Sequence, residues 1–552
     1  MIGAHTHCIQ LYIKRMNGLP LSKALFINSD IQNLCRREPA SVTEDEMKEL
    51  LRHYNLLDGL VSIGKLSVFI YNDHSKNKLG KAIYKNPDSG LLVSQFALAY
   101  LANMFLISGA NDFKDKKISE KENLFGICNA YNHSLIIPLS SNIPQKNFFQ
   151  ALMVRLSFEQ IRFQTNLINT MARTYILFEN VAQNKRPVKI ENLHTLFEKT
   201  TGITIKEYFI YSLLVFTAIQ ETPTFNIDRF LNSDIPHLKH LLIRDKIYKY
   251  LNILTASYRQ FRTTDQQLNS TLNPIYTKTR FNSLWIYPII EVDNKTESGS
   301  YVIPNVCVFL QKAFGDLYWW FHMHFEKEQK QLEFRDYFGS VFQEYVGLIL
   351  KTIYPEEQVH EEITYGKTSN RFVDWWITRG DKVYLFEAKS NQFSLLNRQT
   401  GDADKIMQNE VKKIADGIEQ LHRRVKDIDK YEELKQLRGK RLVCVLVFFD
   451  FPFMSSALYD LQIKEELLVR EKSKGSDGLS SFEVFRLNID ELESFATTSK
   501  QIELEEIFPK YRSDPTKSFL SVVAEESKDG LGNDYLEKAY EDFWNLIDPR
   551  AN

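Results

Sequence analysis

The sequence predicts a large, mostly α-helical N-terminal region followed by a C-terminal α/β domain, in which a mixed central sheet is flanked by helices. Three observations lead to this fold class. Segments with apolar residues at helical spacing dominate residues 1–332. Two short apolar runs flank a glycine-containing turn within 372–386, which is the pattern of a β-hairpin. A continuous apolar run at 441–450 has the length of a buried strand.

Length and composition allow several domains. The chain has 552 residues, of which 43% are hydrophobic, so it can bury more than one core. We predict four units: a mixed, mainly helical domain at 1–142, a helical domain at 143–332, the α/β domain at 333–495, and a charged C-terminal tail with a short helix at 496–552.

The first unit mixes helices with short strand-like stretches. Thr43–Leu57 is predicted as a helix, with Thr43 as the N-cap and Glu46 completing a capping box. Leu66–Tyr71 has the pattern of a short strand. Leu91–Ser108 lacks charge but carries polar residues and is only just long enough to cross a bilayer, so we interpret it as a buried helix.

The second unit is predicted to be almost entirely helical. Asn147–Gln183 contains no glycine or proline and favours one long helix or two abutting ones. Further helices are expected at about 189–220 and 235–264. Trp285–Val292 resembles a strand, and the aromatic-rich segment Gln311–Phe325 leads into the α/β domain.

The α/β domain combines helices, strands and one hairpin. Its further predicted elements are a helix at Phe338–Leu350, a helix at Glu410–Arg424, a strand at Arg441–Asp450, a polar loop at Glu471–Ser481, an edge strand at Phe482–Leu487 and, in the tail, a helix at Tyr535–Leu546.

The register of the hairpin can be counted from the sequence. Its strands are Phe372–Thr378 and Val383–Phe386, and a two-residue turn at Gly380-Asp381 suits a tight hairpin because glycine tolerates positive φ. In this register Asp374 lies directly opposite Glu387.

Lys389 follows Glu387 on the same face of the predicted sheet. Both faces are apolar: one carries Trp375, Ile377, Tyr384 and Phe386, and the other carries Trp376, Val383 and Leu385. Burying two carboxylates and an ammonium group there costs several kcal/mol unless they compensate one another or bind a cation. Two interpretations follow: a site for a hard divalent ion such as Mg²⁺, or a purely structural ion-pair network centred on Lys389.

Asp374 followed by Glu387-Ala388-Lys389 resembles the signature of the PD-(D/E)XK nuclease superfamily, which has the restriction-endonuclease-like fold. Val373 stands where that signature usually has proline. The resemblance covers about residues 333–490, less than a third of the chain, and its motif is short.

Two further residues are assigned by this resemblance. Glu344 lies in the segment that resembles the first core helix, which often lends a carboxylate to the metal site; a solvated surface glutamate is the alternative. Gln420 resembles a glutamine that some branches place on the helix after the third strand, and an ordinary surface residue is its alternative.

The resemblance implies metal-assisted hydrolysis of phosphodiester bonds. Asp374, Glu387 and the carbonyl of Ala388 are expected to bind Mg²⁺, or Mn²⁺ in its place, and Glu344 to complete the site. Lys389 lies between acids and is expected to stay protonated, so we favour an electrostatic role on the phosphate over a role as general base.

No nucleotide cofactor is expected. Gly59–Leu66 matches the spacing of a phosphate-binding loop, but Leu66 replaces the hydroxyl residue that binds Mg²⁺, and a helix end precedes the segment where a strand is required.

The cysteines favour a reducing, cytoplasmic setting. They are odd in number, scattered and without metal-ligand spacing: Cys8, Cys35, Cys128, Cys307 and Cys444. No signal peptide is apparent at the N-terminus, and His5-Thr6-His7-Cys8 is interpreted as an exposed chain end, because no partner ligands follow at finger spacing.

The net charge of −1 provides no overall attraction to nucleic acid, so binding depends on local patches. One candidate patch comprises Lys405, Lys412, Lys413, Arg423, Arg424, Lys426, Lys430, Lys435, Arg438, Lys440 and Arg441. Acidic residues are interspersed, so a solvated surface laced with ion pairs is the alternative to a phosphate-binding surface.

We therefore expect a Mg²⁺-dependent nuclease, with DNA as the substrate, acting in prokaryotic defence against phage or foreign DNA. The defence role rests only on the analogy of a nuclease unit behind a long helical region. A catalytically inactive nuclease fold that binds nucleic acid or serves in assembly is the alternative, and a protein-interaction scaffold in the helical region is a third. No membrane partner is expected, while a homo-oligomer or a defence-system partner protein stays open.

Overall fold

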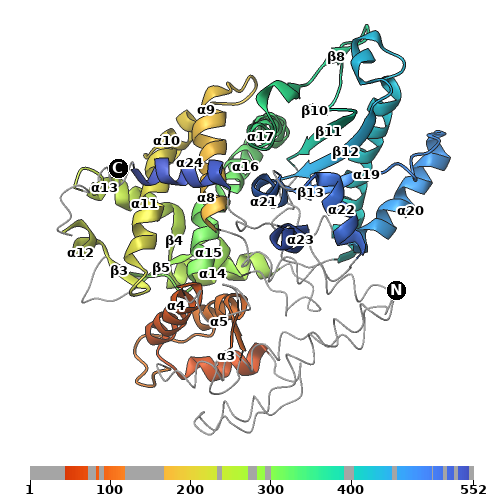
Figure 1. Cartoon of the computed structure of the whole chain (residues 1–552). Coiled ribbons are helices and arrows are strands. Elements are labelled where there is room, and N and C mark those ends of the chain that lie inside the picture. The colour runs from red at the N-terminus through yellow and green to blue at the C-terminus, as the bar shows by residue number, and fades with distance from the viewer. Residues whose placement is uncertain are drawn as a thin grey trace.

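The protein is mostly helical, with two small mixed sheets of four and five strands (Figure 1). The computed structural model describes residues 44–72, 83–85, 92–118, 167–232, 239–270, 282–292, 300–390, 403–449, 457–499, 502–513, 519–526 and 533–545. Several predictions fall outside these ranges: the N-cap at Thr43, the histidines and Cys8 near the N-terminus, Cys35, Cys128, and the first part of the helix predicted at Asn147–Gln183.

The first helical layer contains α3 (Glu44–Arg52), α4 (Leu56–Asn72) and α5 (Gln95–Ile107), with the small strand pair β1 (Ile83–Lys85) and β2 (Leu92–Ser94). The prediction of a strand at 66–71 is wrong, because these residues continue the buried helix α4. The segment 59–66 also lies inside α4 and forms no phosphate-binding loop. α5 is buried, as predicted. None of the helices in the described ranges combines the length and hydropathy needed to cross a bilayer.

The second helical layer surrounds the four-stranded sheet. Its helices are α8 (Leu167–Tyr175), a π-helical turn at Ile176–Val181, α9 (Ala182–Asn184), α10 (Leu193–Thr201), α11 (Ile205–Ala218), α12 (Ile227–Leu231), α13 (Arg244–Leu254), α14 (Tyr258–Asn269), a 3₁₀ turn at Ser283–Trp285, α15 (Val306–Leu310), a second π-helical turn at Gln311–Gly315, and α16 (Leu317–Lys327). The sheet has the order β3 (Thr224–Asn226), β6 (Ser300–Val302), β5 (Ile289–Glu291), β4 (Thr255–Ser257), and only β4 and β5 are parallel.

The helical segment predicted at about 235–264 is interrupted by a strand. β4 separates α13 from α14 and pairs with β5. Ser257 then acts as the N-cap of α14, because its hydroxyl accepts a hydrogen bond from the amide of Gln260. Pairing with a distant strand thus overrides a local helical pattern.

The five-stranded sheet has the order β13 (Phe485–Asn488), β12 (Arg441–Phe448), β11 (Lys382–Lys389), β10 (Trp375–Arg379), β7 (Val359–Glu361). β10 runs antiparallel to both of its neighbours, β7 and β11, whereas β11, β12 and β13 are parallel. Three short elements accompany the sheet along the chain. A 3₁₀ turn at Glu356–Gln358 precedes β7, the strand pair β8 (Thr364–Tyr365) and β9 (Asn370–Arg371) lies between β7 and β10, and a second 3₁₀ turn at Glu432–Leu437 precedes β12. The predicted edge strand is confirmed, since β13 forms one edge of this sheet.

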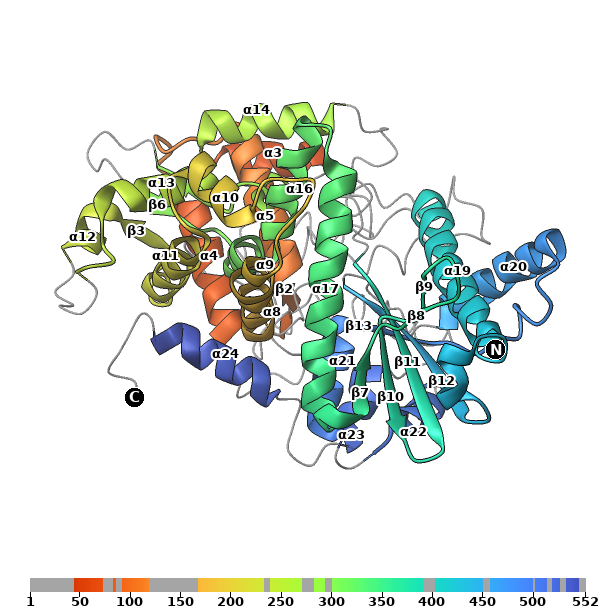
Figure 2. The same ribbon diagram turned by 90° about the horizontal axis from the view of Figure 1, so that it is seen from above.

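Helices cover both faces of this sheet. α17 (Gln331–Ile353) packs on the face that carries Trp375, while α19 (Ala403–Asp427) and α20 (Ala457–Lys474) belong to the other layer. Figure 2 shows α17 running between the N-terminal helices and the sheet. Its Gly347 makes this contact possible, because a Cβ there would lie 2.0 Å from Cζ2 of Trp375.

The chain ends with α21 (Ile489–Thr498), α22 (Leu504–Ser513), α23 (Phe519–Glu526) and α24 (Asp534–Asn545). α24 lies against α8 of the helical region (Figure 1), and its buried Phe543 contacts Tyr175 and Phe209. α24 is therefore folded back onto the helical region, whereas α22 packs beside the five-stranded sheet, where Glu505 pairs with Lys382 and Phe508 stacks on Phe485.

Candidate functional site

The predicted hairpin and its register are confirmed. β10 and β11 pair antiparallel from Arg379 opposite Lys382 to Trp375 opposite Phe386. Gly380 in the turn has φ of 62°, a left-handed conformation that glycine adopts without steric cost. The predicted alternation of faces also holds, because the apolar residues of the two faces belong to two different core clusters.

Asp374 immediately precedes β10, and its side chain extends the contact between the two strands. Its Oδ2 accepts a hydrogen bond of 2.7 Å from the backbone amide of Ala388. The ladder between β10 and β11 ends at Trp375, so this carboxylate satisfies an amide just beyond the ladder.

Glu387, Lys389 and Gln420 form a closed ring of hydrogen bonds. Glu387 Oε1 accepts from Lys389 Nζ at 3.0 Å and from Gln420 Nε2 at 2.6 Å, and Gln420 Oε1 accepts from the same Nζ at 2.8 Å. Two of these residues come from β11 and the third comes from α19. The ring therefore depends on how closely the helix approaches the strand.

That approach is helped by a glycine on α19. A Cβ added to Gly417 would lie 3.1 Å from Leu446 on β12 and 3.4 Å from Cε of Lys389. The helix backbone consequently packs close to the sheet, and the Gln420 amide, on the next turn of the helix, reaches both partners.

Burial dominates the electrostatics of Asp374. Burial first, and then the nearby charge of Glu387, raise its pKa to about 8, against the opposing effects of the Ala388 amide and Lys389. Glu387 is only 4% exposed, and within the described residues its second oxygen, Oε2, has no hydrogen-bond partner. A buried carboxylate oxygen without a partner is costly, so this corner of the site favours a cation.

Glu344 is not part of this hydrogen-bonded group. It lies on α17, which packs on the opposite face of the sheet from the ring, and its carboxylate contacts Lys185 at 3.7 Å. Both side chains are about 40% exposed, at 44% and 37%. The neighbouring carbonyl of Gln343 accepts a 2.8 Å hydrogen bond from the indole of Trp375, which holds this turn of α17 beside β10.

A third acid near the site, Glu362, was not predicted from the sequence. Glu362 follows β7 directly, and Glu361, the last residue of β7, pairs with Trp375. Burial and then the charge of Glu387 raise the pKa of Glu362, whereas the charge of Arg371 lowers it. The short strand-like segment Val359–Glu361 upstream of the hairpin is the sequence signal that points to it.

Several lysines and arginines of the candidate basic patch form ion pairs with neighbouring acids. Lys413 pairs with Glu410, Lys430 with Asp427, and both Lys435 and Arg438 with Glu432. Arg424 donates instead to the carbonyl of Phe372. These contacts agree with the solvated, ion-paired alternative for the residues concerned; the side chain of Lys405 lies outside the described residues.

Across the described segments, no three His, Cys, Asp or Glu side chains form a group that is arranged to hold a metal ion. The acids that gather here are Asp374 and Glu387, with Glu362 close enough for their charges to interact. Two carboxylates suit an ion that keeps several of its own water ligands, as Mg²⁺ does.

No family model matches the chain, and neither does a curated protein or a solved structure. The chemistry of the residues at the site is therefore the basis for assigning a function.

Proposed function

We propose that the C-terminal α/β unit is a Mg²⁺-dependent nuclease of the PD-(D/E)XK type, that DNA is its substrate, and that it serves in prokaryotic defence. One observation carries the proposal: Asp374, Glu387 and Lys389 lie at the end of one hairpin, where Asp374 accepts a hydrogen bond from the Ala388 amide and Gln420 is hydrogen-bonded to both Glu387 and Lys389. The order of helices and strands around this hairpin supports the same fold.

The residues present fit a divalent ion. Glu387 Oε2 is buried and has no hydrogen-bond partner within the described residues. Burial first, and then the charge of Glu387, raise the pKa of Asp374, and a cation between the two carboxylates would oppose both effects. Asp374, Glu387 and the carbonyl of Ala388 are the proposed ligands, for Mg²⁺ or Mn²⁺. A bound ion supplies Lewis-acid polarisation of the phosphate and a water of lowered pKa.

Glu362 is better placed than Glu344 to act as a third acid beside Asp374 and Glu387. The charge of Glu362 affects Asp374, and the charge of Glu387 affects Glu362, whereas the carboxylate of Glu344 contacts Lys185. We propose that Glu362 tunes the charge of the site, and that Glu344 contributes only if its ion pair with Lys185 opens.

Lys389 is positioned to act on the phosphate. Glu387 and Gln420 accept hydrogen bonds from its ammonium group, and its side chain retains 20% exposure. A fixed ammonium group stabilises negative charge that develops on phosphate oxygens in the transition state. Gln420 is a positioning residue, because it orients both Lys389 and Glu387.

A catalytically inactive nucleic-acid-binding module is the second candidate. It is favoured by the completeness of the ring, in which Lys389 already neutralises Glu387 without any metal. Such a ring can be structural in its own right.

A cleavage assay tests the proposal. The purified chain is incubated with linear, circular and single-stranded DNA and with RNA, in Mg²⁺, in Mn²⁺ and in chelator. We expect cleavage of DNA that requires the metal and falls by at least about a hundredfold in Asp374→Asn. Asp381→Asn, an exposed acid in the turn of the same hairpin, is the matched control and should cleave normally.

DNA binding without cleavage in either metal would favour the inactive module instead. Equal cleavage by Asp374→Asn and the unchanged chain would remove Asp374 from the mechanism.

A further inference from the structure

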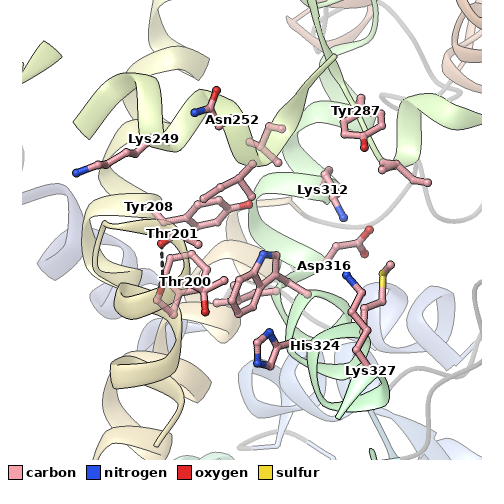
Figure 3. Close-up of a pocket in the computed structure, with 17 residues that line it drawn as sticks. Thr200, Thr201, Tyr208, Lys249, Asn252, Tyr287, Lys312, Asp316, His324 and Lys327 are labelled. Carbon is pink, nitrogen blue, oxygen red and sulfur yellow. Dashed lines mark hydrogen bonds between the residues drawn. The ribbon is translucent and has the colours of Figure 1, made fainter. Parts of the chain in front are cut away.

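A cavity of about 490 Å³ opens in the helical region, away from the nuclease-like site (Figure 3). It is lined by residues between Phe197 and Lys327, which come from α10, α11, α13, α16 and the segments that join them. This volume lies within the range of pockets that hold small organic ligands. None of the residues proposed for hydrolysis lines the cavity.

One wall of the cavity is aromatic. Phe197 packs against Trp320 with ring centroids 4.8 Å apart, and against Tyr208 at 5.7 Å. The ring of His324 stacks on Trp320 at an interplanar angle of 11°. Tyr287 also lines the cavity. Flat rings held by their neighbours provide a surface on which another planar ring can stack.

The charged groups of the lining are mostly cationic. Lys249, Lys312 and Lys327 line the cavity together with a single acid, Asp316. Figure 3 shows the amino groups of Lys312 and Lys327 and the carboxylate of Asp316 gathered on one side. Lys249 points outward on the other side, where its Nζ contacts Asp245 at 2.7 Å.

Neutral hydrogen-bonding groups complete the lining. Thr200 and Thr201 at the end of α10 and Asn252 on α13 contribute hydroxyl and amide groups. Lysines, hydroxyls and an amide can together hold a phosphate and the polar edge of a heterocycle.

We propose that this cavity binds a nucleotide, with its phosphates at Lys312 and Lys327 and its base against the aromatic wall that includes Trp320. The combination carries the inference, since cationic groups alone would accept any anion and an aromatic wall alone would accept any flat apolar molecule. The sequence predicts no nucleotide cofactor, and this proposal departs from that prediction because the cavity is formed by segments that only the fold brings together.

Binding is tested on the full-length chain by isothermal titration calorimetry and thermal unfolding, with ATP, GTP, adenosine and tripolyphosphate as probes. All measurements are made in chelator, so that metal bound at the nuclease-like site cannot contribute. We expect ATP or GTP to bind with a Kd in the micromolar range and to raise Tm.

Lys327→Ala and Lys312→Ala are each expected to weaken this binding by at least about tenfold, because each removes a charge-assisted contact. Lys199→Ala is the matched control: it removes an exposed lysine from α10 that pairs with Glu191, and it should bind as tightly as the unchanged chain. Circular dichroism of each variant establishes that it is folded.

Absence of binding by both nucleotides, or unchanged binding in folded Lys312→Ala and Lys327→Ala, would overturn the proposal. Equal affinity for tripolyphosphate and ATP would overturn the assignment of a nucleotide, because the aromatic wall would then contribute nothing. Since the readout is binding, the result is independent of whether the chain cleaves DNA.

Discussion

Arg173 and Glu493, 320 residues apart in the sequence, form a buried two-pronged ion pair that joins the helical region to the α/β unit. Arg173 Nε lies 2.7 Å from Oε1 of Glu493, and a second guanidinium nitrogen lies 2.8 Å from Oε2. Tyr345 of α17 donates a 2.6 Å hydrogen bond to the same carboxylate, and Asp490 also pairs with Arg173. This network links α8, α17 and α21.

Breaking one side of this pair is expected to be costly. Arg173→Met leaves Glu493, whose side chain is 1% exposed, without its cation, and we expect the free energy of unfolding to fall by about 3–5 kcal/mol. The double variant Arg173→Met, Glu493→Met should recover much of the loss, because no charge is then left buried without its cation. Urea denaturation of the unchanged chain, Arg173→Met, Glu493→Met and the double variant measures both effects, and additive losses in the double variant would contradict this account.

Asp374 makes the stability of the metal-free protein depend on pH. Its folded pKa of about 8 lies above the ordinary value of 3.8, so the folded protein holds a proton that the unfolded chain releases. Stability should therefore fall as pH rises from about 4 to 8, by an amount on the order of a few kcal/mol. Denaturation in chelator across this range measures the slope, and Asp374→Asn should flatten it.

Added Mg²⁺ should oppose this loss. The ion binds ionised carboxylates, so its stabilising effect should grow as pH rises through the pKa of Asp374. A Mg²⁺ effect of the same size at pH 5 and pH 8 would show that Asp374 is not a ligand.

Gln420 should affect activity more than stability. Gln420→Ala removes a donor to Glu387 and an acceptor for Lys389, so we expect kcat to fall about 10–100-fold and Mg²⁺ affinity to weaken. Glu419→Gln is the control, since the Glu419 carboxylate pairs with Arg470 and Lys474 and, among the described residues, is not hydrogen-bonded to the ring. Calorimetric Mg²⁺ titration separates this positioning role from a loss of folding. An unfolded variant would show neither Mg²⁺ binding nor cleavage, whereas loss of the positioning role weakens both.

Two glycines allow the stability cost of a steric clash to be compared with the cost of an unfavourable backbone conformation. Gly347→Ala places a Cβ 2.0 Å from Trp375, whose indole is held by the carbonyl of Gln343, so we expect a loss of more than about 3 kcal/mol. Gly380→Ala meets nothing within 4 Å, and only its φ of 62° opposes the substitution, at about 1–2 kcal/mol. Chemical denaturation compares the two, and equal losses would show that α17 shifts to accept the methyl group.

The hairpin could be predicted because every determinant of it is local. Gly380 permits the turn, the alternation of apolar residues sets the faces, and the register then brings Asp374, Glu387 and Lys389 to one end. Predictions that depended on distant partners fared less well. The pattern at 235–264 contains no signal that β4 pairs with β5, and the pattern at 66–71 predicts a strand where the structure has buried helix.

Periodicity and residues close together along the chain were enough to predict the two-faced hairpin, the helices that cover it and the gathering of its acids with Lys389. Three other features became visible in the folded chain: Gln420 closes the ring, the charge of Glu362 acts on Asp374 while Glu344 contacts Lys185, and Arg173 joins the two regions. Those contacts depend on how whole helices pack against a sheet, and packing is set by the shapes of many side chains at once, which no short stretch of sequence contains.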